Sequence, residues 1–373
     1  YAIGSGYAQL KRCREFLRQG LAHRPIRTSW HALYQQACRM SGAEGVLIPM
    51  YDRLLKENPG NSTLLYLRGR IDMSSAVSLD HYRRAIAADP KDPDPWIATA
   101  FELQARGDFA GAKKACTTAV GLKPDDQEAL EALFQARLAL EEYDALEKEL
   151  RAQQRGSPVD LTLQRKLLLV RAAQGDLKRT ANAHQAYVQA VRAEMSDDPF
   201  ELIPSSQIML LYLQGDLRGV LRVARRMKDA ESSSWMRFEA HLELGDPGRA
   251  AKILDSSTGQ FDAYDYLLIS LGYRQKGAQA EAQKWREKAL DMFSKGTIVD
   301  KQVARLLGAG DKLRLEDVDD FGLVPFNKTQ LLVALAANCP SKRRELLARA
   351  RKLNYNLLAP HRFLKSVMAA LEK

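Results

Sequence analysis

The sequence predicts an all-α fold, an α-α superhelix (solenoid) of antiparallel helix pairs, from three observations. Prolines recur at a nearly constant spacing, glycines recur at a similar one, and no long segment alternates strictly between apolar and polar residues as a half-buried strand would. The prolines are Pro25, Pro59, Pro90, Pro124 and Pro158, at intervals of 34, 31, 34 and 34 residues. The glycines are Gly175, Gly215, Gly245, Gly277 and Gly310, at intervals of 40, 30, 32 and 33 residues. Intervals of this size are typical of stacked helical units.

Residues 93–126 illustrate one such unit. Its apolar residues recur at helical spacing, first at Trp96, Ala100 and Leu103, and then at Phe109, Ala112, Cys116 and Ala119. Gly107-Asp108 separates the two halves, and Pro124 ends the second half because proline cannot continue a helix interior. The unit is therefore predicted to be two helices joined by a short turn.

This unit resembles the tetratricopeptide repeat, a 34-residue pattern of large, small and aromatic positions that ends in a proline. The residues at those positions are Trp96, Ala100, Leu103, Gly107, Ala112, Cys116, Ala119 and Pro124. The resemblance extends over about residues 25–290 and implies about eight hairpins, in which small residues let the paired helices approach closely. The hairpins are expected to begin near Thr28, Ser62, Pro93, Gln127, Leu161, Glu201, Glu231 and Ala263. Phe134, Leu168 and Phe238 depart from the pattern, because each stands where a small residue is usual.

Three parts are predicted along the chain. Residues 1–27 are expected to form an N-terminal helix or capping segment, residues 28–296 the repeat array, and residues 297–373 a divergent helical cap. Terminal units of a stacked array need an atypical outer face, which accounts for a divergent end. Within the cap, helices are expected over 329–338, 341–353 and 360–373.

Charge is concentrated at the two ends of the chain. There are 56 Lys and Arg against 46 Asp and Glu, and residues 1–43 and 297–373 each carry a net charge of +6. Basic ends are typical of binding to nucleic acid or to another anionic surface, and an ordinary solvated surface explains them as well. No uncharged stretch reaches the roughly 20 residues of a membrane helix, so no span is expected within the chain.

The cysteines favour buried thiols over a metal site or a disulfide framework. Cys13, Cys38, Cys116 and Cys339 lie far apart in sequence, without zinc-type spacing. Sparse thiols lean towards a reducing compartment such as the cytoplasm. Because the sequence begins at Tyr1, a periplasmic or membrane-tethered protein with a segment upstream is also expected to fit.

No motif for catalysis or for cofactor binding stands out. The sequence lacks a Gly-x-x-x-x-Gly-Lys phosphate loop, a Gly-x-Gly-x-x-Gly dinucleotide fingerprint, a His-Glu-x-x-His metal motif and a Gly-x-Ser-x-Gly elbow. Asp320-Phe321-Gly322 matches a kinase tripeptide, but the rest of that signature is missing. We predict a protein that is not an enzyme and has no cofactor or metal site. A regulatory or substrate-binding part of a larger enzyme or membrane-anchored protein is an alternative.

The resemblance implies that the first helix of each hairpin lines a concave face that holds the partner. The residues at the positions that would face this groove are Tyr66, Arg70, Asp94, Ile97, Phe101, Gln104, Glu128, Glu131, Arg165, Tyr212, Trp235 and Arg274, together with Leu169, Met209, Glu239 and Tyr264. Aromatic and arginine side chains are frequent interface anchors. A register shift of one residue would instead bury several of the aromatics, above all Trp235 and Tyr264.

A basic run near the C-terminus is a second candidate surface. Its basic residues are Lys342, Arg343, Arg344, Arg349, Arg351 and Lys352, and a stripe of Leu346, Leu347, Ala350 and Leu353 is expected to be buried. A solvated helix face is the favoured interpretation, and contact with phosphates is the alternative. The leading prediction for the whole chain is a non-catalytic protein-interaction scaffold that binds an extended peptide or a partner helix. Binding of nucleic acid or an anionic surface through the basic ends is the alternative.

Overall fold

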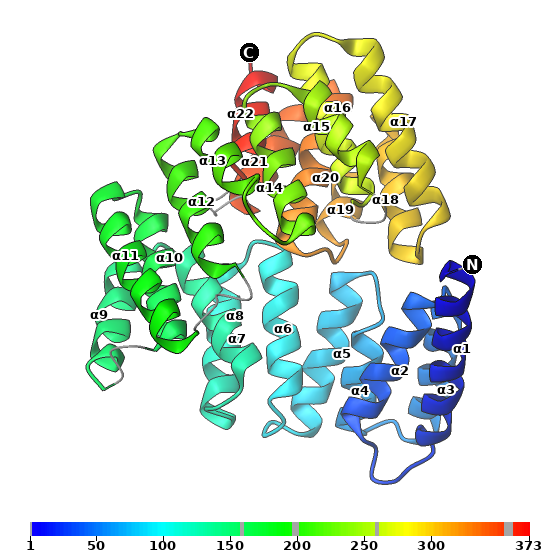
Figure 1. The fold of residues 1–373 in the computed structure, drawn as a ribbon. Helices are drawn as coiled ribbons and strands as arrows, with labels where there is room; N and C mark the ends of the chain where they lie inside the picture. Colours follow the sequence, from blue (N-terminus) through cyan, green and yellow to red (C-terminus); the bar gives the residue numbers. More distant parts are fainter. Residues whose placement is uncertain (1, 157–159, 196–200, 258–260, 354–360) are drawn as a thin grey trace. The chain divides into compact units, whose positions relative to one another are not determined.

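The protein is all-α over the residues that the computed structural model describes, which are 2–156, 160–195, 201–257, 261–353 and 361–373 (Figure 1). These residues contain no strand, and an isolated antiparallel bridge joins Ser74 to Phe321. The predicted all-α class is therefore confirmed. Pro158 and Pro360, which took part in the predictions above, lie outside the described residues.

The chain divides into two compact units. Unit 1 consists of residues 1–136 and 291–325, and unit 2 of residues 137–290 and 326–373. The three-part division drawn from the sequence stays a prediction.

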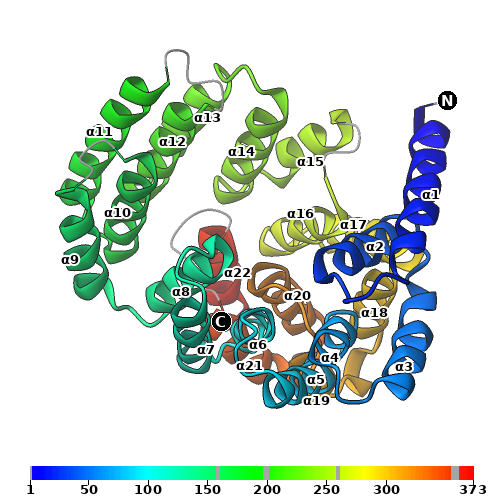
Figure 2. The same cartoon turned by 90° about the horizontal axis from the view of Figure 1, so that it is seen from below.

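Unit 1 is built from consecutive helices that pack as neighbours, α4 on α5 and α6 on α7 (Figure 2). Its helices are α1 (Ala2–Gly20), α2 (Thr28–Met40), α3 (Leu47–Glu57), α4 (Ser62–Gly69), α5 (Ser75–Ala88), α6 (Asp94–Ala105), α7 (Phe109–Leu122), most of α8 (Gln127–Ala139), α18 (Ile298–Gly308) and α19 (Leu315–Asp319). One-turn 3₁₀ helices occupy Glu44–Val46 and Gly310–Lys312.

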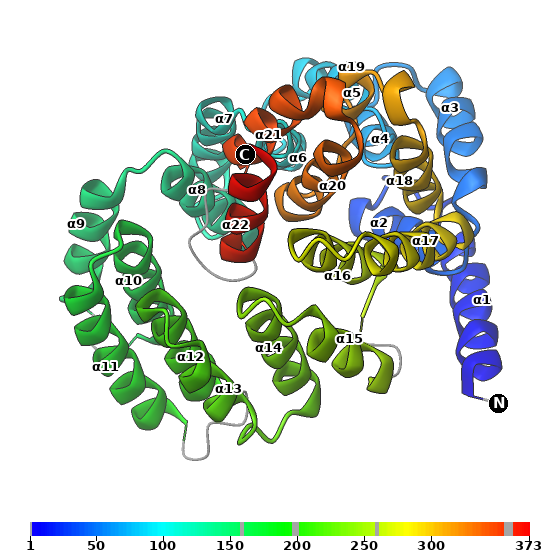
Figure 3. The same ribbon diagram turned by 90° about the horizontal axis from the view of Figure 1, so that it is seen from above.

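Unit 2 repeats the same pairing, with α10 on α11, α12 on α13 and α14 on α15 (Figure 3). Its helices are α9 (Tyr143–Gln154), α10 (Leu161–Gln174), α11 (Leu177–Glu194), α12 (Leu202–Gln214), α13 (Leu217–Ala224), α14 (Ala230–Glu243), α15 (Pro247–Ser256), α16 (Ala263–Gln275), most of α17 (Gln279–Lys295), α20 (Pro325–Asn338), α21 (Arg343–Leu353) and α22 (His361–Leu371). A 3₁₀ turn at Pro340–Lys342 precedes α21.

The hairpins begin where the sequence predicts them. The first helices α2, α4, α6, α8, α10, α12, α14 and α16 each begin within one residue of the expected position. The three helices expected near the C-terminus are present as α20, α21 and α22, and α20 begins four residues earlier than predicted. The proline and glycine spacing thus locates helix ends as well as helix class.

A repeated Gly-Asp turn connects the two helices of several hairpins. Gly175 and Gly215 adopt φ values of 74° and 75°, in the left-handed region that glycine enters without steric strain. The aspartates that follow, Asp176 and Asp216, accept hydrogen bonds from backbone N–H groups in the first turn of the next helix, at 2.9 and 2.8 Å. The glycine ends one helix and the aspartate begins the next, which explains why the two residues recur together.

Small residues bring the paired helices close together, as Gly69 shows in unit 1. A methyl group added at Gly69 would lie 2.5 Å from Cε1 of Tyr82, a buried side chain on α5. A contact this short cannot be tolerated, so the α4–α5 packing requires glycine.

Gly69→Ala is therefore expected to destabilise unit 1 by about 1–2 kcal/mol through overpacking. The matched control is Gly121→Ala on α7, where an added methyl group meets nothing within 4 Å. That control is expected to stabilise the helix by up to about 1 kcal/mol because alanine loses less backbone entropy. Urea unfolding followed by circular dichroism measures both changes. Equal shifts in the two variants would contradict the close helix approach at Gly69.

Residues 320–322 connect to the start of α5 within unit 1. The Asp320 carboxylate accepts hydrogen bonds from the Ser74 hydroxyl and from the Ala76 N–H, the latter at 2.8 Å. The backbone N–H of Gly322 donates to the Met73 carbonyl at 3.1 Å. Asp320 thus places a negative charge at a helix N-terminus, where the backbone dipole favours it. The tripeptide that resembles a kinase motif has this structural position.

The thiols and helix compositions complete the description. Cys38, Cys116 and Cys339 are buried, whereas Cys13 is exposed, and all four are free thiols. Burial raises the pKa of Cys116 to about 11, so this thiol is protonated at neutral pH. Within the described ranges, no helix combines the length and the apolar character needed to cross a membrane.

Candidate partner-binding site

An apolar hollow of about 320 Å³ lies on the first helices of three successive hairpins in unit 2. Among the residues predicted to face a groove, those that line this hollow are Arg165, Leu169, Met209, Tyr212, Trp235 and Glu239. Residues that the sequence reasoning missed complete the lining: Leu168, Tyr187, Leu202, Ser205, Ser206, Ile208 and Met236. Helices α10, α12 and α14 thus converge here as the repeat pattern implies, and α11 adds Tyr187. We call this site the apolar hollow.

An aromatic cluster fixes the wall that α14 contributes. The Trp235 and Phe238 rings stack with centroids 6.0 Å apart and planes at 21°, and Phe261 lies 5.0 Å from Phe238. Phe238 is fully buried, so its ring supports the half-buried Trp235 from the core side. The larger residue at the usual small-residue position therefore positions an aromatic side chain of the hollow.

The hydroxyl groups of Tyr212 and Ser206 are already used within the protein. The Tyr212 hydroxyl donates to the Met236 carbonyl at 3.2 Å, and the Ser206 hydroxyl donates to the Ile203 carbonyl at 2.9 Å. Tyr212 is only 2% exposed and belongs to the buried cluster of α12 and α14. These residues form the floor of the hollow rather than mobile contacts.

Glu239 is the chemically unusual residue of the hollow. It is 3% exposed, and its Oε1 atom is buried without a hydrogen-bond partner among the described residues. Burial, and then the neighbouring carboxyl groups of Glu243 and Asp265, raise the pKa of Glu239 well above its usual 4.5. A carboxyl group in this position holds a proton in the empty site at neutral pH.

In unit 1, the structure brings four predicted residues from three first helices into one electrostatic neighbourhood. Arg70 donates to the Tyr66 hydroxyl at 3.1 Å, and its guanidinium lies 5.5 Å from the Tyr66 ring centroid. The charges of Arg70 and Glu128 act on Asp94, whose pKa is raised mainly by burial. Residues on α4, α6 and α8 are therefore neighbours, as the repeat register predicts.

Several predicted groove residues are packing residues instead. Tyr66, Ile97, Gln104, Tyr212 and Tyr264 are each at most 9% exposed, because the hairpins pack more tightly around these positions than the repeat register alone indicates.

Two of them show how this packing works. Ile97 packs against Ala119 and Ala129, and the Gln104 side chain donates to the Ala132 carbonyl at 2.9 Å. These contacts join α6 to α7 and α8, so neither side chain is available to a partner.

The remaining predicted groove residues differ in exposure. Phe101 is 41% exposed on α6, and Glu131 accepts a hydrogen bond from Gln135 at 2.9 Å. Arg274 donates to Asn338 of α20 at 3.3 Å, so α20 takes up part of its hydrogen-bonding capacity. Phe101 remains a candidate contact residue.

The basic run forms α21 with the buried stripe that the sequence predicts. Leu346, Leu347, Ala350 and Leu353 are buried. Arg343 donates to the Ala336 carbonyl at 3.2 Å, and Arg351 pairs with Glu372. Arg344 and Lys352 are exposed, whereas Lys342 and Arg349 are half-buried. Contact of this face with phosphates stays a prediction.

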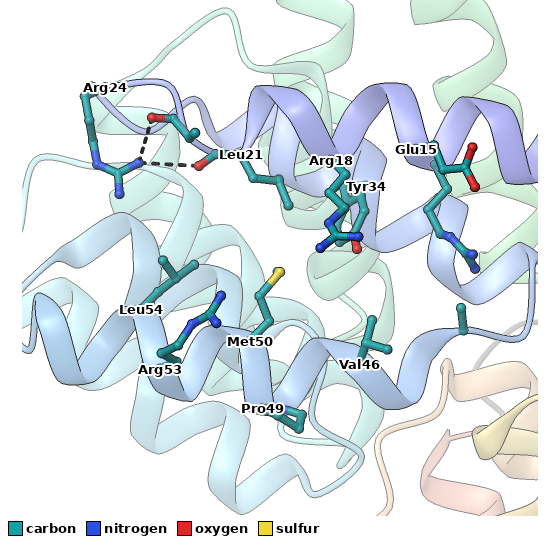
Figure 4. A pocket seen from close by; sticks show the side chains of 13 residues that line it. Glu15, Arg18, Leu21, Arg24, Tyr34, Val46, Pro49, Met50, Arg53 and Leu54 are labelled. Carbon is teal, nitrogen blue, oxygen red and sulfur yellow. Dashed lines mark hydrogen bonds between the residues drawn. The ribbon is translucent and has the colours of Figure 1, made fainter.

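A second hollow, of about 710 Å³, lies among α1, α2 and α3 in unit 1 (Figure 4). Its charged lining is Arg14, Arg18, Arg24, Arg53 and Glu15. Figure 4 shows Arg24 bonded to two backbone carbonyl oxygens, of Leu21 and Ala22, each at 3.4 Å. We call this site the basic hollow. The sequence indicated only an excess of positive charge in residues 1–43, and the part played by Arg53 of α3 is visible only after folding.

No group of three or more potential metal-ligating side chains occurs in the described ranges. The features on the page define a class: an all-α repeat protein of tetratricopeptide-like helix pairs.

Comparisons with solved structures find two distant likenesses. The structure of Naa15/Naa10 bound to HypK-THB aligns with 95% of this chain at 13% identity and a TM-score of 0.32, and this chain spans 64% of that one. The P58(IPK) TPR domain aligns with 87% of this chain and 98% of its own length, at 15% identity and a TM-score of 0.26. No family model matches the sequence, and no curated protein matches it. The repeat assignment rests on the helix bounds and helix pairs described above.

Proposed function

We propose that this protein is an interaction scaffold that holds an extended segment of a partner protein against the first helices of its hairpins. The partner segment lies across the apolar hollow, and its side chains enter that hollow. Binding uses a preformed surface and forms no covalent bond, so little ordering entropy opposes it on the scaffold side.

The observation that carries the proposal is the composition of the apolar hollow. Apolar side chains from three consecutive first helices surround a small number of polar groups, the pattern typical of a recognition pocket. Trp235 is held in place by Phe238, so it can act as a rigid anchor. Stacked repeats present such positions in a row, which suits an extended ligand.

Leu169→Asp is expected to weaken peptide binding at least tenfold, because it places a carboxylate in the apolar wall; tenfold corresponds to about 1.4 kcal/mol. The probe is a peptide selected on the protein from a random phage-displayed library, then synthesised and titrated by fluorescence anisotropy. The control is Leu177→Asp, because Leu177 is exposed in the first turn of α11 and does not line the hollow.

The control variant is expected to bind like the parent protein. The proposal would be contradicted if Leu169→Asp bound equally well, or if no peptide were enriched over selection on an unrelated protein.

The basic hollow favours a second candidate function, binding of an anionic polymer through the N-terminal region of unit 1. Four arginines and one glutamate line it, and the guanidinium groups present donors that match phosphate oxygens. Figure 4 shows Arg18 and Arg53 on facing helices of this hollow.

Nucleic-acid binding at this hollow is expected to fall steeply as salt rises, because each neutralised phosphate releases counterions. A fluorescein-labelled single-stranded oligonucleotide titrated at several salt concentrations measures the slope. Arg18→Gln combined with Arg53→Gln should reduce that slope by about 2. Absence of binding at the lowest salt concentration would remove this candidate.

A further inference from the structure

Three carboxyl groups lie close together beside the apolar hollow with a single cation to balance them. Glu239 and Glu243 occupy successive turns of α14, and Asp265 lies in the first turn of α16. The charges of Glu243 and Asp265 both act on Glu239. Arg362 of α22 reaches Glu243 at 3.6 Å, and Oε1 of Glu243 has no hydrogen-bond partner among the described residues. Positive charge is therefore deficient at this point.

The other polar groups near Glu239 do not satisfy it. Asp265 is used at the start of α16, where its carboxylate accepts from the Asp262 N–H at 2.8 Å. The Tyr212 and Ser206 hydroxyls donate to backbone carbonyls. Arg165 lines the same hollow from α10, but it is not among the charges that shift the pKa of Glu239. An unpaired buried carboxyl group destabilises the empty protein, and a ligand that pairs with it regains that energy.

The remaining walls specify the rest of the ligand. Leu168, Leu169, Met209 and Trp235 present hydrocarbon and aromatic surface around the approach to Glu239. A ligand group that fits needs an apolar stem followed by a cationic end. Lysine and arginine side chains have this construction, because each carries its charge at the tip of an aliphatic chain. Aromatic rings add attraction for cations.

We propose that the apolar hollow selects a basic side chain of the bound partner segment, with the aliphatic stem against Leu169 and Met209 and the cation paired with Glu239. This inference rests on the proposed peptide-binding function and specifies the chemistry of the segment. Binding of the cation favours the ionised carboxylate, so the proton that Glu239 holds in the empty site is released. Affinity therefore increases as pH rises towards the pKa of Glu239 in the free protein.

The test is a double-mutant cycle between Glu239→Gln and the peptide selected on the parent protein. In the peptide, each lysine or arginine is replaced in turn by norleucine, which keeps the stem and removes the charge. At one position, this replacement is expected to weaken binding to the parent protein at least about tenfold and to Glu239→Gln less than about twofold. Exchanging lysine for arginine at that position identifies which cation the hollow prefers.

Controls separate this inference from the proposed function. Glu281→Gln on α17 removes a carboxylate outside the hollow and should leave the peptide preference unchanged. Calorimetry in two buffers of different ionisation enthalpy should detect proton release with the parent protein and none with Glu239→Gln. If peptides bind and Leu169→Asp abolishes binding, but no basic position couples to Glu239, the cation inference is overturned and the scaffold function stands. If no peptide is enriched, both are overturned.

Discussion

Replacing Phe238 with alanine is expected to lower the free energy of unfolding of unit 2 by about 3–5 kcal/mol. Phe238 is fully buried on α14, and its ring contacts the rings of Trp235 and Phe261. Truncation removes buried apolar surface and leaves a cavity that the surrounding helices fill only partly. The loss is large because one side chain fills the space between helices at a position where the repeat pattern usually has a small residue.

Phe101→Ala is the matched control, since it makes the same chemical change on a first helix where the ring is 41% exposed. Its effect on stability is expected to stay below about 1 kcal/mol. Urea unfolding followed by tryptophan fluorescence and circular dichroism measures both variants. Comparable losses in the two variants would contradict the burial of Phe238 and with it the packing of α14.

Glu239→Gln is expected to stabilise the protein by about 3 kcal/mol at pH 8 and by little near pH 4.5. The pKa of Glu239 is raised in the folded state, so above its usual value of 4.5 the unfolded chain loses a proton that the folded chain retains. The folded state then binds more protons than the unfolded state, and stability falls as pH rises. Glutamine has nearly the same shape but does not ionise, so it removes this contribution.

Thermal unfolding of the parent protein and of Glu239→Gln across pH 4.5 to 8 measures the difference. The pKa of Asp265, which burial raises to about 7, adds a slope of the same sign in both proteins and cancels in the comparison. A difference that is constant over this pH range would show that Glu239 ionises normally in the folded protein.

The fold was predictable because local chemistry marks each hairpin. Gly175 and Asp176 illustrate this, since a left-handed glycine and a capping aspartate have strong sequence preferences and lie side by side in the chain. The register of the first helices followed from those marks, and it brought Arg165, Trp235 and Glu239 to one hollow.

Depth of burial could not be predicted in the same way. The repeat register identifies the face of a helix but not how closely its neighbours approach, so Ile97 and Gln104 were expected at a surface and are buried. The contact between Asp320 and Ser74 joins residues 246 positions apart, and no local signal marks it. The charge deficit around Glu239 likewise depends on Asp265 and on Arg362, which come from other helices.

Hydrogen exchange of the peptide-bound protein tests the central claim most directly. With the selected peptide bound, the account predicts that protection increases in the first helices α10, α12 and α14, which line the apolar hollow, and that the second helices α11 and α13 change little. Protection confined to α11 and α13, or spread over helices that do not line the hollow, would contradict the assignment of the partner site to the first helices.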